Sequence, residues 1–161
     1  EGEMQTLDIA RGHDILFSQP VSALNRTYRY LVWNRRFADP FLRHTAWHVP
    51  DPLALGPMNE VAGHVRGEHD FASFCRKAEG RSTERTVLSA GWGEGSPLVF
   101  EIRATSFCHQ MVRSVVALCA EVGKGKVQPD DVPAIIAARD RNAARGSAPP
   151  HGLVLWEIDY G

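Results

Sequence analysis

One stretch restricts the fold more than any other: a strand-like segment that leads directly into a helix-forming segment. Apolar and polar residues alternate along residues 98–104, and Thr105 or Ser106 can then accept a backbone N–H and cap a helix. The apolar residues that follow recur at helical spacing, and they are Cys108, Met111, Val112, Val115, Cys119 and Val122. From Val115 onward the segment is apolar on nearly every side, which is typical of a buried helix.

Arg113 lies one turn before the all-apolar part of this segment, so we expect it at the edge of the core. A guanidinium group stays charged, and leaving such a charge buried without its anion costs about 3–5 kcal/mol. The sequence therefore predicts a carboxylate or a phosphate opposite Arg113. The alternatives are an ordinary structural ion pair and a side chain that extends to water.

Length and composition favour one soluble domain. The chain has 161 residues, of which 43% are hydrophobic, and no apolar run approaches the ~20 residues that a membrane helix needs. Its first residues, 1–4, lack the basic-then-apolar pattern of a signal peptide. The three cysteines are an odd number in apolar surroundings. We therefore expect buried thiols and a cytoplasmic protein.

The pattern of elements predicts an α+β fold with a largely antiparallel sheet and helices packed on one face. Strands are expected at 26–34, 43–49, 83–92, 98–104 and 153–160, and helices at 52–65, 106–123 and 129–144, with a turn and short helix at 67–75. Residues 26–34 carry apolar groups on both faces, which indicates an inner strand. Tyr28 and Tyr30 share one face, either as core filling or as an aromatic platform in a cleft.

Charge and motifs exclude several function classes. The net charge is −1, so nucleic-acid binding would need a local basic face, and arginines do cluster in residues 26–43, 76–85 and 139–145. The seven histidines lack metal-ligand spacing, so we expect no metal. A metal-dependent hydrolase that uses the histidines is therefore the weakest of the functional hypotheses. The sequence contains no serine-hydrolase elbow, phosphate loop or dinucleotide fingerprint.

Four segments, in order along the chain, resemble the motifs of TruA-type tRNA pseudouridine synthases. They are Arg26-Thr27-Tyr28-Arg29-Tyr30, then Gly67-Glu68-His69-Asp70-Phe71-Ala72-Ser73-Phe74, then Phe107-Cys108-His109-Gln110-Met111-Val112-Arg113, and finally Ala148-Pro149-Pro150-His151-Gly152-Leu153. The similarity covers about residues 26–160 and corresponds to the C-terminal half of that family's catalytic fold. Residues 1–25 match poorly, so we divide the chain into segment 1–25 and an α+β domain at 26–161.

The resemblance implies isomerisation of uridines in the tRNA anticodon stem-loop, without a metal or an organic cofactor, by a homodimer. It implies that Tyr28 stacks on a flipped uracil, that Arg113 pairs with the catalytic aspartate, and that Leu153 contacts the base. A further set of residues would bind the RNA, and these are His109, Gln110, Arg26 and Arg85. Aromatic stacking would offset roughly 1–3 kcal/mol of the cost of extruding a base.

The family's essential aspartate lies in a Gly-Arg-Thr-Asp-type motif upstream of this region, and residues 1–25 contain no such motif. Asp8 and Asp14 stand in different contexts, and Asp70 belongs to another motif. We therefore expect the 161-residue chain to be inactive and the activity to belong to a longer protein. The alternative is a non-catalytic RNA-binding or dimerisation module of the same fold.

Overall fold

The computed structural model describes residues 23–161. Its strands are β1 (Asn25–Trp33), β2 (Trp47–His48), β3 (Gly67–Asp70), β4 (Glu84–Gly93), β5 (Leu98–Ala104) and β6 (Leu153–Asp159). Its α-helices are α3 (Leu55–Val65), α4 (Met111–Gly123) and α5 (Val132–Ala138), and three 3₁₀ turns are η1 (Pro129–Asp131), η2 (Arg141–Ala144) and η3 (Pro150–Gly152).

The six strands form one sheet in the order β2-β1-β5-β4-β3, with β6 also paired to β1. Every pairing is antiparallel except that of β1 with β2. Strand β1 therefore has neighbours on both sides, with β5 on one and β6 and β2 on the other. The predictions of an α+β fold and of an inner strand at β1 are both confirmed.

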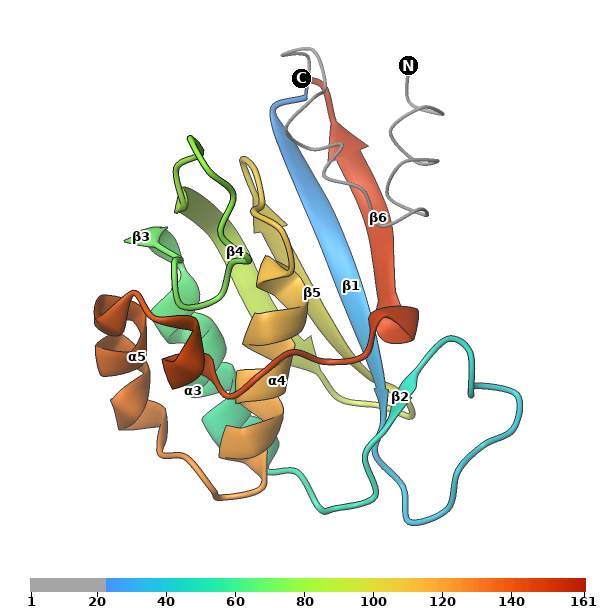
Figure 1. Cartoon of the computed structure of the whole chain (residues 1–161). Helices are drawn as coiled ribbons and strands as arrows, with labels where there is room; N and C mark the ends of the chain where they lie inside the picture. The colour runs from blue at the N-terminus through green and yellow to red at the C-terminus, as the bar shows by residue number, and fades with distance from the viewer. Residues whose placement is uncertain (1–22) are drawn as a thin grey trace.

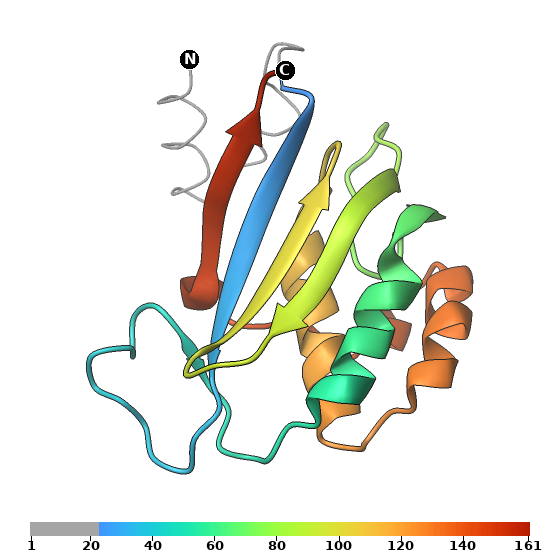
Figure 2. The same ribbon diagram turned by 180° about the vertical axis from the view of Figure 1, so that it is seen from behind.

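The three helices lie on one face of the sheet (Figure 1), and the opposite view shows strands β6, β1, β5 and β4 with no helix of residues 23–161 in front of them (Figure 2). The core fills the space between the layers. Its fully buried side chains include Tyr30, Phe100 and Ile102 from the sheet and Met58, Val61, Met111 and Leu118 from the helices. The helices of residues 23–161 fall short of the length and hydropathy that a membrane span requires.

Two predicted elements differ from the structure. Most of residues 43–49 forms no strand, because the backbone N–H groups of Thr45 and Ala46 both donate to the carbonyl of Leu42 and close a turn. The turn and short helix predicted at 67–75 begin instead with β3, which pairs with β4. Asp70 ends this strand, and its Oδ1 accepts the N–H of Ala72 and the hydroxyl of Thr83, so a turn and not a helix follows.

Left-handed residues set two helix limits that the apolar pattern did not reveal. Helix α4 begins at Met111, and neither Thr105 nor Ser106 caps it, because Gln110 precedes it with a φ of 67°. The helix predicted at 129–144 is interrupted by Arg139, whose φ is 49°, and its remainder is the 3₁₀ turn η2. Positive φ is rare outside glycine, so helical periodicity alone does not predict it.

Gly63 offers a simple test of helix α3. It lies inside the helix and is exposed, and a Cβ added there would meet no atom within 4 Å. Gly63→Ala should therefore raise the free energy of unfolding by about 0.5–1 kcal/mol, because alanine loses less backbone entropy on folding. Urea unfolding measures the change.

Gly125→Ala is the matched control for this substitution. Gly125 also faces open space, but its φ is 83°, in the left-handed region that favours glycine. Alanine there should lower the free energy of unfolding by about 1 kcal/mol or more. A gain of stability in both variants would contradict the backbone argument.

Candidate active site

Strand β1 presents two tyrosines, Tyr28 and Tyr30, on the face that the helices cover. Tyr28 is 4% exposed and Tyr30 is fully buried, so both rings fill the core and neither forms an open aromatic platform in residues 23–161. The ring of Tyr28 meets Phe107 edge-on, with 4.9 Å between ring centroids. Burial raises the pKa of the Tyr28 hydroxyl, and the charge of Arg26 opposes that rise. The stacking role of Tyr28 stays a prediction.

Arg113 occupies the first turn of α4, where it is half-buried as the sequence predicted. Its Nε donates to the carbonyl of Ala148 at 2.7 Å, and the N–H of Ala148 donates back to the carbonyl of Arg113 at 2.9 Å. These two bonds fix the guanidinium against residues 148–153. No carboxylate within residues 23–161 forms an ion pair with Arg113. The predicted anion is therefore not supplied by this part of the chain.

The segment at 148–153 is held against β1 by Tyr30. The hydroxyl of Tyr30 donates to the carbonyl of Pro149, and a Cβ on Gly152 would lie only 2.7 Å from Cζ of the Tyr30 ring. Burial raises the pKa of Tyr30, and the nearby charge of Arg113 opposes that rise. Leu153 starts β6 opposite Tyr30 and packs against the core. Residues 148–153 thus contact both Arg113 and Tyr30, and they place Leu153 beside Tyr30.

His109 and Gln110 lie in the turn before α4. The carbonyl of His109 accepts the N–H of Arg76 at 2.8 Å, and Oε1 of Gln110 accepts from Arg141 at 3.1 Å. The Gln110 side chain is therefore already engaged within the protein. The predicted RNA contacts of His109 and Gln110 stay untested.

The cysteines differ from the prediction of three buried thiols. Cys75 and Cys108 form a disulfide, with 5.6 Å between their Cα atoms, and both are buried. They stand 33 positions apart in the sequence, so only tertiary packing brings them together. Cys119 is a free buried thiol as predicted, and burial raises its pKa to about 12.

The two predicted RNA-binding arginines lie at one end of the sheet. Arg26 of β1 pairs with Ala104 of β5, and Ala104 pairs with Val87 of β4. The first residues of β1 and of β4 therefore lie at the same end of the sheet. Arg26 is 5% exposed, and its Nε has no acceptor within residues 23–161. Arg85 is half-buried and donates to the carbonyls of Ser82 and Glu84. Burial lowers the pKa of Arg85, and the charge of Arg81 adds to this.

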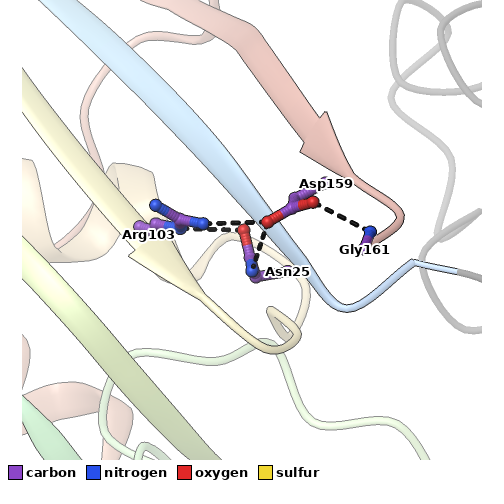
Figure 3. A network of polar contacts seen from close by, with 4 residues as sticks. All are labelled: Asn25, Arg103, Asp159 and Gly161. Atoms are coloured by element: carbon purple, nitrogen blue, oxygen red, sulfur yellow. Dashed lines mark hydrogen bonds and ion pairs between the residues drawn. The ribbon is translucent and has the colours of Figure 1, made fainter.

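A polar network positions the far end of β6 (Figure 3). The carboxylate of Asp159 accepts from Gly161 N–H at 2.9 Å, from Arg103 at 3.0 Å and from the amide of Asn25 at 3.3 Å. Arg103 also donates to the side-chain oxygen of Asn25 at 2.8 Å. The network joins β1, β5 and β6 at the end of β6 opposite to Leu153.

The same network should make stability depend on pH. The Gly161 N–H, then the Asn25 amide and Arg103, lower the pKa of Asp159 below its ordinary value. A carboxyl group with a lowered folded-state pKa adds stability above the unfolded value of about 3.9, and this is lost as pH falls through the folded value. The advantage of the wild type over Asp159→Asn should therefore be constant above about pH 5 and shrink toward pH 3. Parallel urea-unfolding stabilities across this range would contradict the assignment.

Within residues 23–161, no three His, Cys, Asp or Glu side chains are arranged to hold a metal ion. The site instead combines a fixed guanidinium, a buried tyrosine and an apolar residue at the start of β6. Its chemistry is that of a group that orients an anion beside a largely apolar surface. The sequence did not indicate that the Tyr30 hydroxyl and the Ala148 carbonyl hold the site together by hydrogen bonds. Both residues nevertheless lie in motifs shared with the pseudouridine synthases, in residues 26–30 and 148–153.

The fold is that of an α+β protein with a half-buried arginine in the first turn of a buried helix, and comparison with known proteins gives the family. A family model described as tRNA pseudouridine synthase matches residues 61–161. The chain belongs to the tRNA pseudouridine synthase family.

Three curated relatives show how much of the family's length is present. The chain is 38% identical to tRNA pseudouridine synthase A of Bacillus subtilis, an alignment that covers 89% of this chain and 59% of the relative. It is 38% identical to that of Bacillus velezensis, over 98% and 63%, and 41% identical to that of Leifsonia xyli, over 89% and 51%. The chain thus spans about three fifths or less of the length of these relatives.

Proposed function

We propose that this chain is the C-terminal part of a tRNA pseudouridine synthase that isomerises uridine in the anticodon stem-loop. In this reaction the bond between N1 of uracil and C1′ of the ribose breaks, the base turns, and C5 bonds to C1′. C5 then loses its proton, and N1 takes up a proton, so the product is an isomer of uridine. The observation that carries the proposal is Arg113, which is half-buried and fixed by Ala148 but has no carboxylate partner within residues 23–161. Family membership supports the same assignment.

In this proposal Arg113 holds the catalytic aspartate, which a longer polypeptide supplies, ionised and aimed at the ribose. A guanidinium beside a carboxylate lowers the carboxyl pKa and fixes its orientation through charge-assisted hydrogen bonds. Nε of Arg113 donates to the Ala148 carbonyl, so the two terminal nitrogens of the guanidinium are the donors proposed for the carboxylate. Leu153, beside Tyr30 on the neighbouring strand, provides an apolar contact for the base.

Tyr28 is proposed to stack on the extruded uracil, although within residues 23–161 its ring is covered. Stacking would therefore need Phe107 or a neighbouring side chain to move when RNA binds. Arg26 and Arg85, at the shared end of β1 and β4, are proposed to bind phosphates, with His109 and Gln110 near the RNA backbone. The working enzyme is proposed to be a homodimer in the cytoplasm.

Release of tritium from tRNA labelled at uridine C5 tests the proposal. The 161-residue chain should release none, and the full-length polypeptide that carries a Gly-Arg-Thr-Asp-type segment should release it without added metal. Robust release by the 161-residue chain would contradict the need for an external aspartate. No release by the full-length polypeptide, together with tRNA binding, would favour the second candidate, a non-catalytic RNA-binding or dimerisation module.

A further inference from the structure

A second surface lies outside the candidate active site, on the loop that connects β1 to β2. We call residues 34–46 the arginine–phenylalanine loop, and it extends well away from the sheet (Figures 1 and 2). Phe41 is 92% exposed and Phe37 is 75% exposed, more than any other large hydrophobic side chain in residues 23–161. Two such rings on one loop need an explanation, because exposed aromatic side chains often mark binding sites.

The loop is anchored at its base although its rings are exposed. The indole N–H of Trp33 donates to the carbonyl of Phe37 at 2.8 Å, and the ring of His48 is hydrogen-bonded to the carbonyl of Arg35 at 2.8 Å. The N–H of Phe41 donates to the side chain of Asp39 at 2.9 Å. The rings are therefore presented on a fixed backbone, which lowers the entropy cost of binding a partner.

The charge of the loop identifies the kind of partner. It contains Arg35, Arg36 and Arg43 but a single carboxylate, Asp39, whose Oδ1 is engaged in the turn. Within residues 23–161 no ion pair neutralises these three arginines, whereas Arg29 and Arg103 on the sheet are paired with acids. The contacts of the three loop arginines are with neutral groups, since Arg35 donates to the hydroxyl of Ser96, Arg43 donates to the ring of His44, and Arg36 lies over the ring of Phe37. Exposed aromatic rings beside arginines without a carboxylate partner suit a flexible polyanion with planar bases.

We propose that the arginine–phenylalanine loop binds unpaired nucleotides of the RNA substrate, with Phe41 and Phe37 stacking on bases and Arg36 and Arg43 contacting phosphates. This inference rests on the proposed function. A second copy of the chain fits less well, because a two-fold contact would place each arginine-rich loop against the same positive charge.

The loop is continuous with the candidate active site. Its last residue, Ala46, accepts a hydrogen bond from the ring of His151 at 3.0 Å, with that ring nitrogen acting as donor. His151 immediately precedes Gly152 and Leu153, and Trp47 meets the ring of Tyr30 edge-on at 6.4 Å. One RNA strand can therefore contact both the loop and the site.

Binding of fluorescein-labelled tRNA by the full-length polypeptide, followed by anisotropy, tests the inference. Phe41→Ala should weaken binding roughly 5- to 150-fold, whereas Phe41→Trp should bind as well as the wild type because it keeps a stacking surface. Arg36→Gln and Arg43→Gln should each reduce the salt dependence of binding by about one unit of slope. Leu88→Ala is the matched control, since it removes an exposed apolar side chain from β4 and should leave affinity unchanged.

A photo-crosslinking amino acid at position 41 identifies the partner directly. Replacing Phe41 with p-benzoylphenylalanine should give a crosslink to tRNA, and a crosslink to a second copy of the chain would overturn the inference. Wild-type affinity in Phe41→Ala, in an enzyme that still releases tritium, would overturn the loop assignment but leave the proposed function intact. Weakened RNA binding in Phe41→Ala, in a full-length polypeptide that releases no tritium, would support the loop and contradict the proposed function.

Discussion

Arg113→Ala in the full-length enzyme should lower the single-turnover rate of tritium release by roughly 10²- to 10⁴-fold while tRNA affinity changes far less. In the proposed mechanism the variant leaves the catalytic carboxylate without its cation, and losing one member of a buried charge pair costs about 3–5 kcal/mol. It also removes the hydrogen bond to Ala148 that fixes residues 148–153 against α4. Single-turnover kinetics at saturating tRNA, beside equilibrium binding, separates the two effects.

Two further variants sharpen this test. Arg113→Lys keeps the charge but cannot bond both Ala148 and a carboxylate through a planar fork, so it should recover only part of the rate. Arg85→Ala should show the opposite pattern, with weaker binding, a flatter salt dependence and a nearly normal rate at saturation. Equal losses of affinity in Arg113→Ala and Arg85→Ala would count against the division of roles.

Gly152→Ala should be the most destabilising small substitution in the segment that carries Leu153. The added Cβ would lie 2.7 Å and 2.8 Å from Cζ and Cε1 of Tyr30, and 3.0 Å from the carbonyl of Leu31. Tyr30 is fully buried and its hydroxyl is bonded to Pro149, so the ring has no room to yield. We expect a loss of about 1–3 kcal/mol in the free energy of unfolding, or roughly 2–12 °C in Tm, measured by thermal and urea unfolding.

Gly123→Ala is the matched control for Gly152→Ala. Its Cβ would meet the sulfur of Met58 at 2.7 Å, Cγ of Met58 at 3.0 Å and Cδ2 of Leu53 at 3.2 Å. These atoms belong to flexible aliphatic side chains, which repack more easily than an aromatic ring or the backbone. Its cost should therefore be smaller. A double-mutant cycle adds a second check, because Gly152→Ala should cost less in a Tyr30→Leu background that removes the ring. Equal costs in both backgrounds would show that the ring is not the obstacle.

Local patterns predicted the larger part of the fold. Alternation located β1, β4, β5 and β6, and helical spacing located α3 and α4, because both periods follow from which side chains must face a single core. The patterns failed where a polar contact or a left-handed residue decides the backbone. Gln110 and Arg139 limit their helices by a positive φ, and residues 43–46 form a turn that closes on the Leu42 carbonyl.

For the candidate site, the sequence by itself predicted a permanently charged Arg113 at the edge of a buried helix, and Tyr28 and Tyr30 on one face of an inner strand. Only the tertiary structure decided how they are held. The Ala148 carbonyl on Arg113, the Tyr30 hydroxyl on Pro149 and the Cys75–Cys108 disulfide join residues 33 to 119 positions apart. Such pairs leave no local periodicity, since they form only when separate elements fold onto the same sheet.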